Sequence, residues 1–137
     1  MDWKLEVVVV PVSDVDRAKK FYSEQVGFVV DVDQQMSETT RIVQLTPPGS
    51  ACSITIGTGI APGEPGSVKG LQISVSDVEA AHEHLVRNGV DVTEIRHVGA
   101  GGQWEPGKGG PWNSFCFFDD PDGNSWAVQE KPGPGEG

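Results

Sequence analysis

Apolar residues recur along the chain with two periods, and the change from one to the other marks the predicted elements. Leu5–Val12 is a short run rich in β-branched residues, which is typical of a buried strand. After Ser13 or Asp14, either of which can cap a helix, apolar side chains follow the 3.6-residue helical spacing as far as Gly27. Further strands are predicted at residues 28–33, 41–46 and 51–57. The first part of the chain is therefore interpreted as β-α-β-β-β.

The same order of elements returns later in the chain. Val75–Ala81 repeats the V-S-D-V-[D/E]-x-A pattern of Val12–Ala18, and a second amphipathic helix follows it. A strand, possibly bent, is predicted over Val90–Val98, and Phe115–Glu130 is interpreted as a hairpin around a Pro-Asp-Gly-Asn turn. Neither half alone offers enough apolar area for a stable core, so the two are expected to bury their sheets together. The pattern predicts an α+β fold of two β-α-β-β-β modules.

Turn-rich segments set the predicted boundaries. The chain divides into a first module at 1–58, a Gly/Pro-rich linker at 59–69, a second module at 70–130 and a tail at 131–137 that is expected to be disordered, all within one domain. Gly99–Pro111 lies outside the repeat as a long glycine-rich loop that carries Trp104, with Trp112 just after it. Loops of this length in compact domains often serve as lids or binding loops.

Composition narrows the classes of partner. A formal net charge of −10 over 137 residues argues against nucleic acid or an anionic membrane as a partner, because a protein that binds either needs a basic face. The apolar run Val7–Val10 is too short to cross a bilayer, and the expected location is the cytoplasm. Cys52 and Cys116 lie far apart in apolar contexts without a C-x-x-C motif, which favours reduced, buried thiols over metal or disulfide chemistry.

Two segments, together with the repeat, carry a resemblance to a known family. Val10–Tyr22 and the turn sequence Asp120–Asn124 resemble signatures of the vicinal oxygen chelate superfamily, which includes glyoxalase I, bleomycin-resistance proteins and extradiol dioxygenases. The resemblance implies that the modules form a cup-shaped sheet, which usually holds the metal and ligand, and that the protein is a homodimer. Whether the modules pair within one chain or exchange between two chains stays open.

At the positions where catalytic members of that family bind metal, this chain carries residues without strong metal ligands. Such members place His or Gln seven residues before the Asp that follows each first strand, and Glu four residues after each turn glycine. Counting places Val7, Gly70, Ser53 and Ala127 there. None of the four supplies the imidazole, carboxylate or thiolate group that a divalent cation needs. We therefore expect no metal ion and no other cofactor.

Strand alternation extends the count to the remaining residues that face the cup. The predicted ligand-binding residues are small, apolar or neutral-polar, and two tryptophans from the glycine-rich region join them. They are Val7, Val9, Ser53, Thr55, Gln72, Ser74, Ala127, Gln129, Trp104 and Trp112. This lining suits an organic ligand held by apolar contact and amide hydrogen bonds, although a cup filled by its own side chains stays an alternative. Trp126, next to Ala127, is expected to face the helix and the core.

The favoured hypothesis is a metal-independent protein that binds or sequesters a hydrophobic or aromatic small molecule. The alternative is a lyase, isomerase or dioxygenase that has an atypical metal site or uses His97 as a general base, since imidazole titrates near neutral pH. His82 and His84 are two residues apart on a helix and cannot bind one metal together. A third hypothesis is a regulatory or assembly module with an occluded cup.

Overall fold

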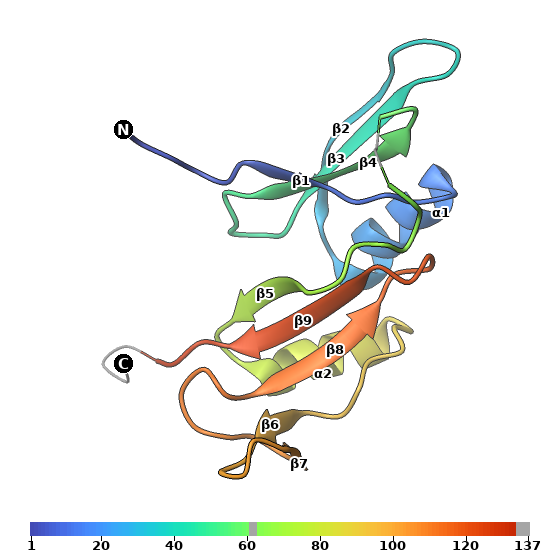
Figure 1. The fold of residues 1–137 in the computed structure, drawn as a ribbon. Helices are drawn as coiled ribbons and strands as arrows, with labels where there is room; N and C mark the ends of the chain where they lie inside the picture. The colour runs from blue at the N-terminus through green and yellow to red at the C-terminus, as the bar shows by residue number, and fades with distance from the viewer. Residues whose placement is uncertain (61–62, 134–137) are drawn as a thin grey trace. The chain divides into compact units, whose positions relative to one another are not determined.

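The computed structural model describes residues 1–60 and 63–133 in an α+β fold (Figure 1). The predicted β-α-β-β-β order occurs in the first half, and the second half has the same order with one additional strand. The chain forms two compact units. The first unit comprises Met1–Val68 together with the turn Asp120–Asn124, and the second unit begins at Lys69 and includes both strands that flank this turn. In the sequence, this turn lies within residues 70–130, the range predicted for the second module. Residues 61–62 of the predicted linker and 134–137 of the predicted tail lie outside the described residues.

The first unit is a mixed sheet with one helical segment. Its elements are β1 (Val7–Val9), α1 (Val15–Lys20), the π-helix η1 (Phe21–Val26), β2 (Val29–Gln35), β3 (Arg41–Thr46) and β4 (Ser53–Thr58). The sheet order is β1-β4-β3-β2, with β1 parallel to β4 and the other pairs antiparallel. Asp14 rather than Ser13 caps α1, because its side chain accepts a hydrogen bond from the Arg17 N–H. Gly27 ends the helical segment in the left-handed conformation, with φ of 101°.

The second unit has the same order of elements with one additional strand. Its elements are β5 (Leu71–Val75), α2 (Val78–Arg87), β6 (Arg96–Val98), β7 (Trp104–Pro106), β8 (Phe115–Asp119) and β9 (Ser125–Glu130). The sheet order is β5-β9-β8-β6-β7, and β5 is parallel to β9. Asp77 caps α2 as Asp14 caps α1, and the Glu130 carboxylate accepts a further hydrogen bond from the Val78 N–H at the helix start.

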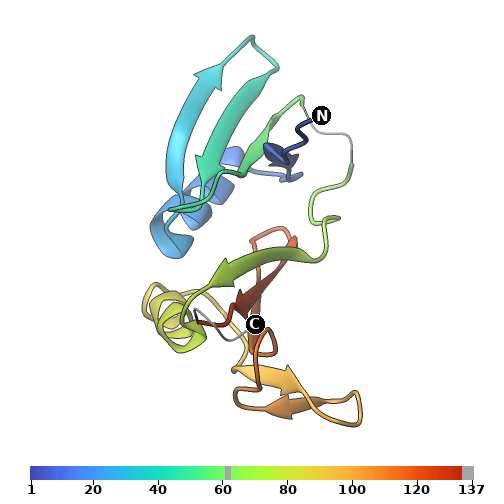
Figure 2. The ribbon, with the colours of Figure 1, turned by 90° about the vertical axis from the view of Figure 1, so that its left-hand side faces the viewer.

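The glycine-rich loop differs from its prediction. Its residues Trp104–Pro106 form β7, which pairs antiparallel with β6 as a short hairpin (Figure 2). The predicted strand Val90–Val98 is correspondingly reduced to β6 and an isolated bridge between Val92 and Phe118. The Asn113 side chain stabilises this hairpin from the other edge of β6, where it bonds both the N–H and the carbonyl of Val98 at 2.8 Å. This side-chain bridge has no counterpart in the hydrophobic pattern, which explains why the pattern missed it.

One face of the second sheet packs on α2 (Figure 1). Cys116, Phe118, Trp126 and Val128 are all buried, and the rings of Phe118 and Trp126 stack with centroids 6.0 Å apart. The prediction that Trp126 belongs to the core is confirmed. Because neighbouring strand residues alternate between faces, the residues between these four project to the opposite side of the sheet.

Both cysteines are free thiols, as expected. Cys116 is fully buried in β8, and this burial raises the pKa of its thiol to about 11. Cys52 is half-buried, so the expectation of burial holds for Cys116 only. Neither thiol pairs with the other in a disulfide.

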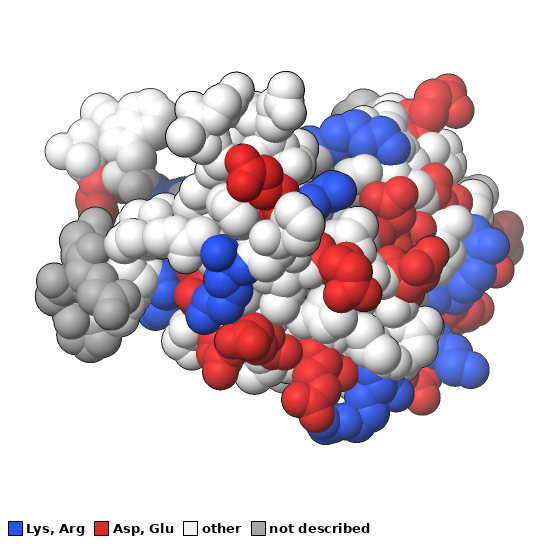
Figure 3. Space-filling model, turned by 90° about the horizontal axis from the view of Figure 1, so that it is seen from below, with Lys and Arg blue, Asp and Glu red and all other residues white. Residues whose placement is uncertain are grey.

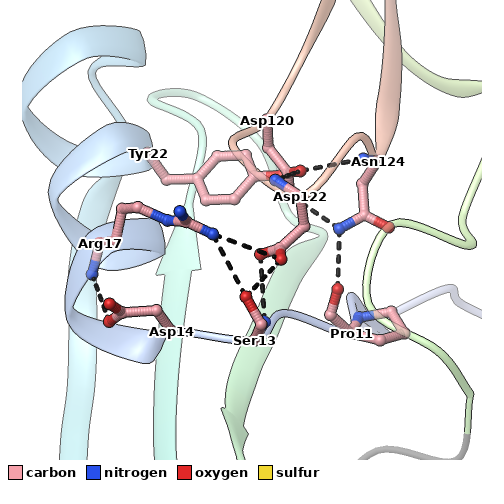
Figure 4. Close-up of polar contacts among 8 residues, drawn as sticks. All are labelled: Pro11, Ser13, Asp14, Arg17, Tyr22, Asp120, Asp122 and Asn124. Carbon is pink, nitrogen blue, oxygen red and sulfur yellow. Dashed lines mark hydrogen bonds and ion pairs between the residues drawn. The ribbon is translucent and has the colours of Figure 1, made fainter.

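The turn Asp120–Asn124 is fixed by a buried hydrogen-bond network (Figure 4). The Asp120 carboxylate accepts hydrogen bonds from the Tyr22 hydroxyl at 2.7 Å and from the Asn124 side chain at 2.8 Å. It also accepts from the backbone N–H groups of Asp122 and Asn124, each at 2.9 Å. Asn124 in turn donates to the Pro11 carbonyl and accepts from the Val68 N–H. A buried carboxylate and a buried amide thus satisfy each other and the backbone around them.

A second carboxylate of the same turn holds the segment before α1. Asp122 accepts hydrogen bonds from the backbone N–H of Ser13 at 3.1 Å and from its hydroxyl at 2.5 Å (Figure 4). The Arg17 guanidinium lies 3.4 Å from the same carboxylate. The V-S-D motif and the P-D-G-N motif, which are far apart in the sequence, are therefore bonded directly to each other.

Asn124→Ala should lower the free energy of unfolding by roughly 2–3 kcal/mol, because it leaves the Val68 N–H without a partner and removes one hydrogen bond each from the buried Asp120 carboxylate and the Pro11 carbonyl. The matched control is Gln103→Ala, which removes an exposed side-chain amide and should change stability by less than about 0.5 kcal/mol. Urea denaturation followed by circular dichroism measures both. Equal effects of the two substitutions would contradict the structural role assigned to Asn124.

Candidate ligand-binding site

The residues predicted to line the site fall into two groups that each share one face of a sheet. In the first unit Val7 lies opposite Ser53 and Val9 opposite Thr55. In the second unit Gln72 lies opposite Ala127 and Ser74 opposite Gln129. Ala127 thus pairs with Gln72. Counting along the sequence gave Gly70, which lies two residues earlier in the chain. A step of two residues keeps the same face, so the predicted lining of the sheet is unchanged.

The first group is partly exposed and partly occupied by internal hydrogen bonds. Val7 and Val9 are exposed, whereas Ser53 is buried. The Ser53 hydroxyl lies 2.6 Å from that of Thr46, and Thr46 also hydrogen-bonds the Asp31 carboxylate. The hydroxyl groups of Ser53 and Thr46 are therefore already paired, which leaves the two valines as the main contact surface for an apolar molecule.

A chain of amide hydrogen bonds crosses the second group. The Gln72 side chain donates to the Gln129 side-chain oxygen, and the Gln129 amide nitrogen donates to the Trp112 carbonyl at 2.7 Å. These bonds fix both glutamines across β5 and β9 and tie them to the segment before β8. The remaining donors and acceptors of the two amides stay available to a polar group of a ligand.

Three aromatic residues that the sequence analysis partly missed stand beside the amides. Phe115 pairs with Gln129 and Phe117 with Ala127, so both rings project from the same face as the predicted lining. Trp104 of β7 meets each ring edge-on, with centroid separations of 5.5 Å. We call Trp104, Phe115 and Phe117 the aromatic platform. The register of the hairpin, counted back from Ala127 across the turn, was the signal that could have identified the two phenylalanines.

Arg96 lies beside the aromatic platform on the same face of the sheet. It lies opposite Phe115, and its guanidinium carbon lies 4.6 Å from the ring centroid of Phe117 and 5.2 Å from that of Trp104. Both distances are within cation–π range. The predicted site did not include this residue because β6 and β7 were not recognised as a hairpin.

Both predicted tryptophans are accessible, with Trp104 at 48% and Trp112 at 45% relative exposure. Trp112 has φ of 61°, a left-handed conformation that side chains other than glycine rarely adopt. Large aromatic side chains that stay accessible offer stacking surface to a planar ligand. A strained backbone at the residue whose carbonyl binds Gln129 is consistent with a segment held in place for a function.

His97 lies apart from this surface. It pairs with Glu105 across the β6–β7 hairpin, so both side chains project from the face opposite to that of Arg96 and Trp104. Its Nδ1 is 2.9 Å from the Gly107 carbonyl, and its Nε2 is 3.9 Å from the Glu105 carboxylate. In the described part of the chain, no three His, Cys, Asp or Glu side chains are grouped so that they could hold a metal ion.

Lys108, near the second sheet, forms ion pairs with two acidic side chains. The ammonium group of Lys108 lies 3.2 Å from Glu130 and 3.6 Å from Glu79, and its pKa is raised mainly by the hydrogen bond to Glu130. In the first unit, hydrogen bonds from Arg41 and then Lys19 hold the pKa of the Asp33 carboxyl well below its usual range.

Acidic and basic side chains are interspersed on the face shown in Figure 3, which carries no extended basic patch. Within the described ranges, no helix has the length and apolar character of a membrane span.

Comparisons with known proteins agree with this architecture. A family model described as the Glyoxalase/Bleomycin resistance protein/Dioxygenase superfamily matches residues 4–128. Uncharacterized protein YetH of Bacillus subtilis (strain 168) is 26% identical over 128 residues, which cover 93% of this chain and 98% of that protein.

Two solved structures illustrate the likeness. TnmS3, an antibiotic binding protein from Streptomyces sp. CB03234, is 32% identical with a TM-score of 0.76, and the match covers 95% of this chain and 97% of that chain. A glyoxalase/bleomycin resistance protein/dioxygenase superfamily member from Sphaerobacter thermophilus DSM 20745 is 26% identical with a TM-score of 0.73, over 95% of this chain and 98% of the other.

The strain at Trp112 can be tested with two substitutions that both remove the ring. Trp112→Gly should be more stable than Trp112→Ala by about 1 kcal/mol, because only glycine adopts a positive φ without steric cost. Urea denaturation of the two variants measures the difference. An alanine variant as stable as the glycine variant would show that the backbone at this position is not strained.

Proposed function

This chain belongs to the Glyoxalase/Bleomycin resistance protein/Dioxygenase superfamily, and from that premise we propose that it binds and sequesters a hydrophobic or aromatic organic compound without the help of a metal ion. The observation that carries the proposal is the open face of the second sheet. There the aromatic platform stands beside the amides of Gln72 and Gln129. Small-molecule sites commonly combine an apolar surface with a few placed polar groups in this way.

The aromatic platform supplies the apolar contact. Trp104 is 48% exposed, and the rings of Phe115 and Phe117 lie parallel to within 10° with centroids 6.0 Å apart. Covering such rings contributes about 25 cal/mol for each Å² of apolar surface removed from water. Aromatic pairs add roughly 0.5–1.5 kcal/mol beyond this burial. A planar aromatic compound gains from both effects, whereas a small polar metabolite gains from neither.

The amides supply orientation. Gln129 is held by Gln72 on one side and by the Trp112 carbonyl on the other, so its position is fixed before a ligand arrives. A hydrogen-bonding group presented in a fixed position selects ligands with little loss of side-chain entropy. Ser74, which lies directly opposite Gln129, adds an exposed hydroxyl on the same face.

Two further observations support binding without a metal. The positions that counting assigns to the metal ligands of the catalytic relatives hold Val7, Gly70, Ser53 and Ala127, and none of these supplies an imidazole, carboxylate or thiolate group. TnmS3, which is 32% identical to this chain, is described as an antibiotic binding protein. We extend a binding role to the present chain on the strength of its own aromatic and amide surface, with that relative as support.

Trp104→Ala should weaken the binding of planar aromatic probes at least tenfold, because it removes the most exposed ring of the aromatic platform. The probes are 2-naphthamide and 1-pyrenecarboxamide, and isothermal titration calorimetry measures their affinity. The matched control is Trp3→Ala, which removes a tryptophan of 83% exposure in the first unit and should leave the affinity unchanged. If neither probe, nor any member of a wider aromatic panel, binds the unaltered protein, the proposed function is wrong.

Treatment with a chelator should leave the affinity for these probes within about twofold of its starting value, since the proposed contacts are apolar and amide groups. The measurement compares protein dialysed against EDTA with protein supplied with zinc, and elemental analysis accompanies it. Stoichiometric zinc, nickel, manganese or iron whose removal abolishes binding would instead favour a metal-dependent enzyme.

A further inference from the structure

Arg96 occupies an unusual position for a charged side chain. It is half-buried, and its guanidinium lies against two rings of the aromatic platform, 4.6 Å from the Phe117 centroid and 5.2 Å from the Trp104 centroid. Its Nε is buried and has no hydrogen-bond partner. The rings hold the cation in place through their faces, but they cannot accept the in-plane hydrogen bonds that a guanidinium group offers.

The other three arginines, and Lys108 beside the second sheet, have acidic partners. In the second unit, Arg87 pairs with Glu83 and Lys108 pairs with Glu130 and Glu79. In the first unit, the half-buried Arg41 lies between Asp33 and Asp16. Among the described residues, no carboxylate lies within ion-pair distance of Arg96 and no hydrogen bond satisfies it. This contrast is informative because the chain has 20 acidic residues and only 10 Lys and Arg.

The orientation of the neighbouring acid explains the contrast. Glu105, on the strand that pairs with β6, lies opposite His97 and therefore projects from the other face of the hairpin. The face that carries Arg96 offers rings, amides and a hydroxyl instead, from Phe115, Phe117, Gln129 and Ser74. A half-buried cation has lost part of its hydration, and the neutral groups around it do not replace the lost interaction with an opposite charge. An anion bound beside it can do so.

We propose that Arg96 receives the acidic group of the ligand, and that the preferred ligands are planar aromatic compounds that carry a carboxylate or a comparable oxyanion. This inference rests on the proposed binding function and adds the charge of the ligand to it. The guanidinium fork matches a carboxylate with two parallel hydrogen bonds, which a neutral amide cannot reproduce. The ring system of the ligand lies against the exposed part of Trp104 while its acidic group bonds Arg96.

The net charge of the protein does not oppose this pairing at short range. At physiological ionic strength the Debye length is about 8 Å, so distant surface carboxylates are screened while a direct contact at a half-buried site is screened much less. The cation–π contacts also hold the guanidinium in place before binding, which reduces the side-chain entropy lost when the ligand pairs with it. Arg96 therefore selects among aromatic ligands by charge.

The test compares two probes of equal shape, 2-naphthoate and 2-naphthamide, by isothermal titration calorimetry at pH 7.5. The unaltered protein should bind the carboxylate at least tenfold more tightly than the amide. Arg96→Met removes the charge but keeps an apolar side chain against the rings, and should abolish the preference while the amide affinity stays within about threefold. Arg96→Lys keeps the charge without the fork and should retain only part of the preference.

Arg87→Met is the matched control, because it removes the same charge from an exposed position on α2 and should leave the preference intact. Thermal melting of each variant verifies that it is folded. Equal binding of the two probes by the unaltered protein, or a preference that survives in Arg96→Met, would overturn the role of Arg96 while the binding function stands. Failure of both probes and of their pyrene counterparts to bind would overturn the proposed function, and this inference with it.

Discussion

The buried carboxylate of Asp120 is the constraint from which the arrangement of the candidate site follows. A buried carboxylate is costly unless donors surround it, and here Tyr22, the Asn124 side chain and two backbone N–H groups all donate to it. These bonds fix the turn, and the turn fixes the register between β8 and β9. A slip of one residue in that register would turn Phe117 away from the open face and toward α2. The aromatic platform therefore depends on a hydrogen-bond network that does not touch it.

One face of the second sheet has a structural role, and the other carries the proposed binding site. One face is closed by α2 over Cys116, Phe118, Trp126 and Val128, all nearly inaccessible to solvent. The other keeps partly exposed aromatic rings, amides and an arginine on the same strands. Accessible apolar surface of this kind, bordered by polar groups, is typical of ligand grooves and interaction sites. Because successive residues of a strand point to opposite faces, residues that pack in the core alternate along β8 and β9 with residues of the proposed binding face.

The sequence predicted most of the fold because its signals were local and repeated. The V-S-D motifs gave both helix starts, and Arg41–Thr46 was predicted with the bounds that β3 has. The shared faces of the predicted lining also followed from alternation alone. The β6–β7 hairpin was missed because β7 is three residues long, contains Pro106 and lies among glycines, so no periodicity marks it. Arg96 and Trp104 come together only through that hairpin, and no local pattern could reveal their contact.

The proposed binding role can be compared with the chemical groups on the open face. General acid–base catalysis needs a group that gains and loses a proton near neutral pH. On this face Gln72, Gln129 and Ser74 carry amide and hydroxyl groups, which do not exchange a proton in that range. His97 has the required chemistry but projects from the other side of the hairpin with Glu105. In the proposed role, a ligand on the aromatic platform is oriented and charge-matched by groups that do not transfer protons, as sequestration requires.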